Sequence, residues 1–199
     1  GTAINAYLED VYDALDLDIT PNRPDGFSHY GVAREIALKT GRKLKELSIK
    51  KVTKKAHDIH DIAAVKIADK EDCPRYMGAV LENVSVGPTP DWMVARLKAA
   101  GQRSINNIVD ISNYVLLEMG HPTHIFDYDK IPSNTIGIRR VKNDRQITTL
   151  DEEKRKLSQQ QLLITDGKKP IALAGIMGGL NSAVTENTTT VFVESAYFD

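Results

Sequence analysis

The sequence has one cysteine, no long apolar run and almost no net charge. Cys73 has no second cysteine to pair with, so a disulfide within the chain is excluded, which fits a reducing cytoplasm. No apolar stretch approaches the ~18 residues of a membrane-crossing helix, and the N-terminus lacks the basic and apolar regions of a signal peptide. We therefore expect a cytoplasmic protein with no membrane partner.

The charge balance gives no overall positive field of the kind that favours binding to nucleic acids. The 26 Lys and Arg residues are offset by 27 Asp and Glu residues, which gives a formal net charge of -1. Local basic runs occur, for example at 50–55 and 139–145, but such runs are usually solvated loops. Contacts with RNA must therefore be local or supplied by another domain.

Nucleotide-binding loops are also missing. The glycine-rich segment GIMGG, residues 175–179, has neither the Lys-Ser/Thr pair of a P-loop nor GxGxxG spacing. Its three glycines leave backbone N–H groups open to an approaching ligand. A tight turn between two strands explains the same glycines, so both interpretations stay open.

What the sequence does contain is a mixture of helical and extended patterns. Its 199 residues, 41% of them hydrophobic, are enough for a single domain, 1–199, with possible halves at 1–61 and 62–199. Capping residues and glycines predict one helix from Ser28 to Gly41 and another from Thr89 to Gly101. Alternation predicts strands at 14–19, 62–67, 76–86, 135–141, 146–150, 162–165, 171–174 and 190–198.

Two features concern the ends of the chain. Residues 4–12 are expected to form a short helical turn. The sequence stops inside its last predicted strand, so we expect a piece of a longer protein.

The segment 104–117 carries a single charged residue, Asp110, which predicts a buried helix. At helical spacing, Asn106, Asp110 and Asn113 form a polar stripe beside an apolar face. Each of these groups needs a hydrogen-bond partner, because an unpaired buried polar group costs about 1–3 kcal/mol. The helix is expected to end near Gly120.

The loop expected after this helix carries His121, His124 and Asp127. Beside the polar stripe, it is expected to form one wall of a site. Two histidines and a carboxylate are also possible zinc ligands, but i, i+3 spacing in a loop that contains proline is weak evidence for a metal. His57 and His60 lack a nearby third ligand and are interpreted as part of a solvated loop.

The last predicted strand contains the least expected residue. Glu194 shares a face with Phe192 and Ala196, and the opposite face is apolar apart from one serine. A carboxylate among apolar neighbours is costly unless it is hydrogen-bonded, and such groups are frequent in functional sites. The alternative is an edge-strand glutamate that faces water or pairs with an arginine.

Arg23 lies in the turn-forming segment TPNRPDG, residues 20–26. Its guanidinium is able to bind an anionic partner. Pairing with Asp25, or capping of a carbonyl, is the structural alternative.

Six motifs, in this order, make the sequence similar to a known family. They are TPNRPD with SHYGVAREIA, CPRY, INNIVDISNYVLLEMG with HPTHIFD, TTLD, ALAGIMGG and VFVESAYFD. In this order and spacing they resemble the bacterial phenylalanyl-tRNA synthetase β subunit, within its editing module, the B3/B4 domain. The resemblance runs from about Leu15 to Asp199.

The resemblance implies a three-layered α+β module with a β-sandwich of unusual topology. It implies a role in the fidelity of aminoacylation, by hydrolysis of the ester of tyrosine wrongly attached to the acceptor end of tRNA(Phe). The expected partners are that tRNA, the synthetase α subunit and the rest of the β subunit, in an (αβ)₂ tetramer. No cofactor is expected for this module, since the ATP and Mg²⁺ of the full ligase belong to its synthetic site elsewhere.

The resemblance also assigns roles to residues at matching positions. Glu194 and the backbone N–H of Gly175 would bind the tyrosine hydroxyl, and Ala174 and Gly178 would line the ring pocket. Asn113 and His124 are the catalytic candidates, His124 acting on water or contacting the terminal adenosine and Asn113 orienting it. Ser112, where the family commonly has Thr, is a further substrate-binding candidate.

The sequence departs from the family pattern at several positions. His121 stands where Gln is common, Ile125 where Ala is frequent, and Gly26 where Cys is often found. These changes bear on the shape of the pocket near His124. They motivate an alternative in which the module is a non-catalytic scaffold or tRNA-binding domain of the synthetase.

Overall fold

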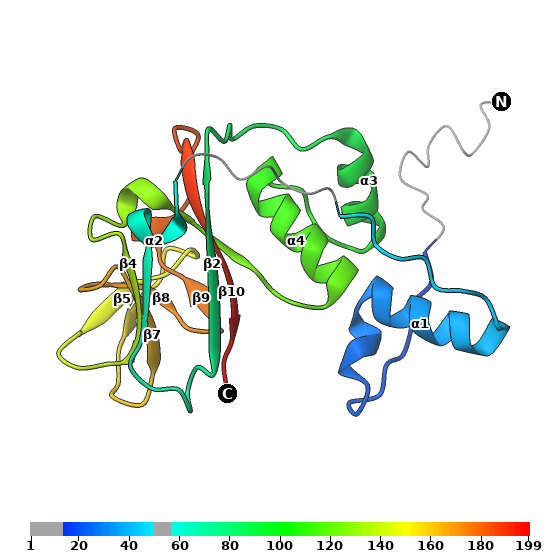
Figure 1. Ribbon diagram of the computed structural model, residues 1–199, viewed down its shortest axis with the longest axis horizontal. Helices are drawn as coiled ribbons and strands as arrows, with labels where there is room; N and C mark the ends of the chain where they lie inside the picture. The colour runs from blue at the N-terminus through cyan, green and yellow to red at the C-terminus, as the bar shows by residue number, and fades with distance from the viewer. Residues whose placement is uncertain (1–13, 50–56) are drawn as a thin grey trace.

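The computed structural model describes residues 14–49 and 57–199, which form three layers (Figure 1). A five-stranded sheet packs on a three-stranded sheet, and helices lie beyond the smaller sheet. The α+β class and the three-layered sandwich expected from the sequence are confirmed. The turn predicted at 4–12 and the basic run at 50–55 lie outside the described residues.

The larger sheet has the strand order β1-β4-β7-β8-β9. Its strands are β1 (Ala64–Ile67), β4 (Thr135–Arg140), β7 (Leu162–Thr165), β8 (Pro170–Leu173) and β9 (Met177–Gly178). β1 runs parallel to β4, and the other neighbouring pairs are antiparallel. A separate hairpin joins β5 (Gln146–Thr148) to β6 (Lys154–Lys156).

In the smaller sheet, β10 (Thr190–Tyr197) lies between β2 (Arg75–Glu82) and β3 (His124–Asp127). Both neighbours run antiparallel to β10. The register places Glu194 opposite Gly78 on one side and opposite His124 on the other. Residues paired directly across antiparallel strands point to the same face, so His124 and Glu194 share a face of this sheet.

The main hydrophobic core fills the space between the two sheets. Its buried members are Cys73, Tyr76, Phe126, Ile131, Ile136, Ile138, Ile164, Ile171, Ala172 and Phe192. Because side chains alternate along a strand, Glu194 lies on the same face of β10 as Phe192. The carboxylate is therefore directed into the core side of the sandwich.

α1 (His29–Thr40) begins and ends at the capping residues that the sequence identifies. The Ser28 hydroxyl accepts a hydrogen bond from the Gly31 N–H at the start of α1, and Gly41 ends that helix in the left-handed region. Glycine is favoured there because it has no Cβ to clash. Short elements complete the chain: α2 (Ile59–Ile62), η2 (Pro24–Phe27), η3 (Tyr128–Lys130) and η4 (Leu180–Ser182).

α4 (Asn107–Met119) is fixed by the first two residues of its predicted polar stripe. The Asn106 side chain caps the helix by accepting from the N–H groups of its first turn, at 3.1 and 3.0 Å. The fully buried carboxylate of Asp110 accepts from the Thr89 hydroxyl at 2.5 Å, the Ser104 hydroxyl at 2.6 Å and the Ile105 N–H at 2.9 Å. These bonds join α4 to the segment that leads into it.

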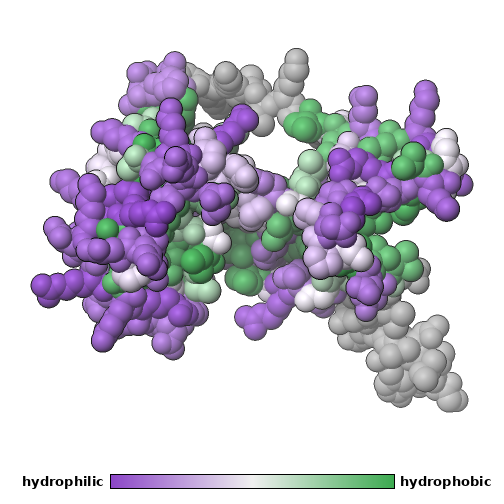
Figure 2. All heavy atoms as spheres, turned by 90° about the horizontal axis from the view of Figure 1, so that it is seen from below, coloured by the Kyte–Doolittle hydropathy of each residue, from purple (hydrophilic) through white to green (hydrophobic). Residues whose placement is uncertain are grey.

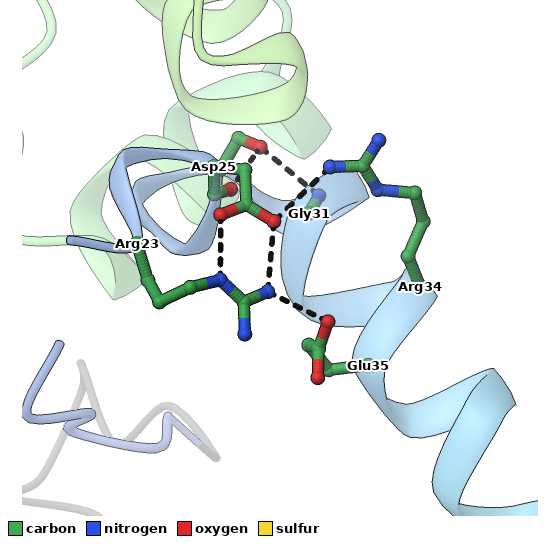
Figure 3. Close-up of polar contacts among 6 residues, drawn as sticks. Arg23, Asp25, Gly31, Arg34 and Glu35 are labelled. Carbon is green, nitrogen blue, oxygen red and sulfur yellow. Dashed lines mark hydrogen bonds and ion pairs between the residues drawn. The ribbon is translucent and has the colours of Figure 1, made fainter. Parts of the chain in front are cut away.

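Arg23 pairs with Asp25, which is the structural alternative to anion binding that the sequence left open. Its guanidinium donates two hydrogen bonds of 3.0 Å to the Asp25 carboxylate and one of 2.6 Å to Glu35 on α1 (Figure 3). Asp25 also pairs with Arg34 at 3.1 Å. The segment 20–26 is thereby fastened to α1, which in turn contacts α4 through a 2.9 Å hydrogen bond from the His29 ring to the Leu117 carbonyl.

Three expectations about local structure are wrong. Residues 14–19 form no strand, because no neighbouring strand pairs with them, and Leu15 is 85% exposed. Thr89 does not cap α3 (Asp91–Ala99); Pro90 occupies that position, and the Thr89 hydroxyl is used by Asp110. The strand predicted to end near residue 86 ends at Glu82.

α4 is also less buried than its low charge predicts. Ile111 and Met119 of α4, and Met77 and Leu81 of β2, are exposed. Seen from below, apolar residues gather in the recess between the sandwich and the helices (Figure 2). The low charge of this helix therefore reflects an open apolar recess as well as a packed face.

We predict that Gly78→Ala destabilises the fold by about 1–3 kcal/mol, the usual cost of overpacking a core. A Cβ at this position would lie 2.1 Å from Cζ of Phe192, a ring packed between the sheets. Urea unfolding measures the loss. Gly87→Ala is the matched control, since a Cβ there meets nothing within 4 Å, and an equal loss in both variants would contradict the packing argument.

Candidate functional site

Glu194 is a buried carboxylate at the centre of the smaller sheet. Its exposure is 6%, and its Oε2 atom accepts a 2.6 Å hydrogen bond from the Tyr76 hydroxyl on β2. Burial raises the pKa of Glu194 to about 7, and the hydrogen bond from Tyr76 acts in the opposite direction. The carboxyl group therefore changes protonation near neutral pH.

This environment decides between the two interpretations of Glu194. β10 is hydrogen-bonded on both sides, so Glu194 does not lie on an edge strand. Its partner is a phenol, and within residues 14–49 and 57–199 Glu194 forms no ion pair. The expected burial is confirmed, and the edge-strand alternative is wrong.

His124 lies directly across from Glu194, as the first residue of β3. The loop position expected from the sequence is therefore wrong, because pairing with β10 draws the residues after Thr123 into the sheet. The imidazole packs edge-on against Phe126, with ring centroids 4.4 Å apart. Burial lowers the pKa of His124 to about 4, so the ring is neutral at pH 7 and one nitrogen is able to accept a proton.

The glycine-rich segment closes the site from the larger sheet. Ala174, Gly175 and Ile176 form the turn between β8 and β9, which confirms the tight-turn interpretation. Gly175 has a φ of 68°, and a Cβ there would contact the Phe198 ring at 3.3 Å, close to the end of β10. The turn therefore lies beside the strand that carries Glu194, and its role in ligand binding stays a prediction.

Gly178 on β9 touches His124. A Cβ at this position would lie 2.5 Å from Cε1 and 2.7 Å from Nε2 of the His124 ring. Only a residue without a side chain allows the imidazole to approach this strand so closely. Gly178 thus brings the glycine-rich hairpin and β3 together.

The two candidates on α4 are placed differently. The Ser112 hydroxyl donates to the Thr123 carbonyl at 2.7 Å and lies 2.9 Å from the Thr123 hydroxyl, which ties α4 to the residue before His124. Asn113 is half-buried, and the hydrogen bonds described for residues 14–49 and 57–199 do not join it to His124. Packing against Phe126 and Gly178 holds the imidazole instead.

The structure therefore brings Glu194, His124 and Gly178 together from distant parts of the sequence, whereas Gly175 lies beside Phe198, near the end of β10, and Ala174 packs against the main core. Asp127, by contrast, points to other partners: its carboxylate accepts from the Thr188 hydroxyl at 2.8 Å and lies 3.4 Å from Lys130. Across residues 14–49 and 57–199, no three His, Cys, Asp or Glu side chains are grouped in a way that could hold a metal ion.

Comparison with known proteins identifies the family. The family model described as the B3/4 domain matches residues 72–199, which is more than half of the chain. The chain belongs to the B3/4 domain family. The match contains every residue named above as a site candidate, from Ser112 to Glu194.

Relatives of this B3/4 domain carry a consistent name. This chain is 50% identical to the phenylalanine--tRNA ligase beta subunit of Geobacillus kaustophilus, over 94% of this chain and 23% of that protein. It is 47% identical to the protein of the same name from Carboxydothermus hydrogenoformans, over 100% of this chain and 25% of that protein. The resemblance seen in the sequence is confirmed, and the chain spans about a quarter of the length of these relatives.

The chain is also similar to a solved structure. It is an N-terminal fragment of the phenylalanyl-tRNA synthetase beta subunit from Pyrococcus horikoshii, 20% identical, with a TM-score of 0.48 over 89% of this chain and 53% of that one. No helix in the described part of this B3/4 domain is long and apolar enough to cross a bilayer.

Sequence reasoning missed Tyr76, the hydrogen-bond partner of Glu194. The two residues are 118 positions apart, and only the pairing of β2 with β10 brings them together. One signal was present: a buried carboxylate needs a donor, and CPRY places a tyrosine at the start of a predicted strand. Without the strand register, that tyrosine is one of 7 in the chain.

The raised pKa of Glu194 predicts a pH-dependent cost to stability. Between its ordinary value of 4.5 and about 7, the folded B3/4 domain holds a proton that the unfolded chain releases, so this residue lowers stability as pH rises through that window. Glu194→Gln removes the titrating carboxyl group and with it this pH-dependent cost. We expect the variant to gain stability relative to wild type by up to about 3 kcal/mol from pH 4.5 to 7, measured by urea unfolding.

His124 has the opposite effect on the pH dependence of stability, so the Glu194→Gln variant must be compared with wild type at each pH. The pKa of His124 falls from 6.5 to about 4, so this residue lowers stability as pH falls through that window. In wild type the two effects partly cancel. Glu186→Gln, at an exposed glutamate, is the control; if the Glu194→Gln difference is the same at every pH, the buried-carboxylate assignment is wrong.

Proposed function

We propose that this chain is the editing module of a phenylalanyl-tRNA synthetase β subunit and hydrolyses the ester of tyrosine on tRNA(Phe). The observation that supports it best is Glu194, a buried carboxylate on an apolar sheet face with His124 directly opposite. The B3/4 family and the names of the relatives support the synthetase context.

Selection of the substrate follows from burial. Tyrosine differs from phenylalanine by one hydroxyl, which a synthetic pocket shaped for phenylalanine does not reject strongly by apolar contact alone. The editing pocket has the opposite task, to reject phenylalanine. With the free oxygen of Glu194 and the Gly175 N–H bound to a phenol, phenylalanine would leave that oxygen and the N–H without a partner, which corresponds to a selectivity of roughly 10³-fold or more.

The hydrolysis itself makes modest demands. Water attacks the ester carbonyl carbon, the bond to the ribose oxygen breaks, and tyrosine and the tRNA hydroxyl are released. The ring of His124, neutral at pH 7, is proposed to accept a hydrogen bond from the attacking water and so position it. Its low pKa makes it a weak base, so positioning supplies much of the rate. Asn113, half-buried on α4, is proposed as a second polar contact to the ester end of the substrate.

The partners follow from the same proposal. The acceptor end of tRNA(Phe) supplies the ester, and the α subunit with the rest of the β subunit completes an (αβ)₂ ligase in the cytoplasm. The module itself needs no cofactor, and ATP with Mg²⁺ serves the synthetic site elsewhere in the ligase.

The alternative function is a scaffold or tRNA-binding module without activity, motivated by His121 and Ile125 in place of the common Gln and Ala. Release of tyrosine from mischarged tRNA(Phe) separates the two functions, measured with this chain and with the complete synthetase. No acceleration by either would rule out the editing proposal. Acceleration by the synthetase alone would place part of the tRNA-binding surface outside this chain.

We predict that Glu194→Ala reduces the preference for tyrosyl over phenylalanyl tRNA(Phe) by at least about tenfold, because the acceptor of the phenol is lost. Initial rates of amino acid release with the two substrates give the ratio. An equal loss of rate on both would assign Glu194 a structural role.

His124→Ala is expected to slow deacylation about 10²-fold, in the range seen when the reacting groups are no longer correctly positioned. Far-ultraviolet circular dichroism checks that the sheet is intact. His121→Ala, at an exposed position, is the matched control. If both variants lose the same activity, the loss belongs to the loop before β3 and His124 has no special role.

A further inference from the structure

Glu194 already has a phenol bound to it in this structure, the side chain of Tyr76. The Tyr76 hydroxyl donates to Oε2 at 2.6 Å, and the tyrosine is 9% exposed within the core between the sheets. Burial, together with the Glu194 charge, raises the pKa of Tyr76, so its hydroxyl keeps its proton and acts as the donor.

The two oxygens of the Glu194 carboxylate are not equivalent. Oε2 is bound to Tyr76, whereas the hydrogen bonds described for the chain do not use Oε1. Among the described residues, only Asp72 Oδ2 is a fully buried side-chain oxygen or nitrogen without a partner. Glu194 Oε1 is therefore not fully buried, and it is the oxygen left free to accept a hydrogen bond from a ligand.

The sheet explains why Tyr76 reaches this carboxylate. Tyr76 pairs with Ala196 and Glu194 pairs with Gly78, so tyrosine and glutamate are diagonal neighbours on one face of β2 and β10. Aromatic side chains span such diagonals. Gly78, the residue opposite Glu194 on β2, has no side chain, and the Phe192 ring occupies the space beside it.

We propose that Tyr76 is a positioning residue: by binding Oε2 it orients Glu194 and leaves Oε1 to accept the phenol of the substrate. The inference rests on the proposed editing function and adds a residue to it. Tyr76 acts only through Glu194 and does not itself touch the ester.

Tyr76 also determines which form of the carboxyl meets the substrate. Three titratable groups face Glu194 from the elements around it: Tyr76 on β2, His124 on β3 and Cys73 before β2. His124 is neutral near pH 7, and burial raises the pKa of the Cys73 thiol. The hydrogen bond from Tyr76 is thus the contact that favours the ionised, phenol-accepting form of Glu194.

The test is Tyr76→Phe in the complete synthetase, with Tyr197→Phe as the matched control, since Tyr197 lies exposed on β10. The ratio of tyrosine to phenylalanine release from tRNA(Phe) is measured against pH. We expect the midpoint of that ratio to move up by about one pH unit in Tyr76→Phe, the size expected for one lost hydrogen bond. Tyr197→Phe should leave the midpoint in place.

A second replacement tests the opposite sign and preserves the fold. 3-Fluorotyrosine at position 76 has a more acidic hydroxyl and nearly the same shape, so it should move the midpoint down. Infrared titration of the Glu194 carboxyl in this chain, without tRNA, should show both shifts independently of activity.

The outcomes separate the two proposals. An active synthetase whose midpoint is unchanged by both replacements overturns the role of Tyr76 and leaves the editing function standing. A wild-type synthetase that releases no tyrosine overturns the editing function, and the substrate role of Tyr76 with it. An infrared titration that is unchanged by both replacements also overturns the positioning role, whatever the activity.

Discussion

The burial of one carboxylate constrains the rest of the site. Glu194 lies on the core side of a central strand, where an unpaired charge would be strongly destabilising. One oxygen is paired with the Tyr76 hydroxyl. The pKa is raised to about 7, so the carboxyl group takes up a proton near neutral pH, which avoids the cost of a buried charge. A fold that places such a group between two sheets sacrifices stability there, and strand pairing must hold Tyr76 and His124 around it.

Different layers of the fold supply different parts of the proposed site. The smaller sheet supplies Glu194 and His124, and the β8–β9 hairpin of the larger sheet supplies Gly178, which approaches the His124 ring. α4 is tied to the start of β3 through Ser112 and is fixed at its own start by Asp110. The recess between the sandwich and the helices (Figure 2) is lined by exposed apolar residues, Met77 and Leu81 of β2 among them, on the face of the smaller sheet opposite to Glu194.

Local features were predictable from the sequence, and long-range ones were not. Ser28, Gly41 and Gly120 mark helix ends, because capping depends on residues close in the chain, whereas Asn106 was placed in the polar stripe and is in fact the N-cap of α4. The strand at 14–19 failed because alternation cannot reveal whether a partner strand exists. His124 was placed in a loop and Tyr76 was missed for the same reason, since both depend on pairing with β10 far downstream. The inward Glu194 was found because its burial conflicts with its own charge.

The central claim is that the buried Glu194 carboxylate recognises the phenol group of tyrosine. Calorimetric titration of the complete synthetase with two non-hydrolysable analogues, adenosine linked through a 3′-amide to tyrosine or to phenylalanine, tests it without catalysis. Saturation of the synthetic site with a phenylalanyl-adenylate analogue beforehand confines binding to the editing site. The account predicts that the tyrosine analogue binds roughly 10³-fold more tightly, and that Glu194→Ala removes most of this difference. Equal affinities for the two analogues in the wild-type protein would contradict it.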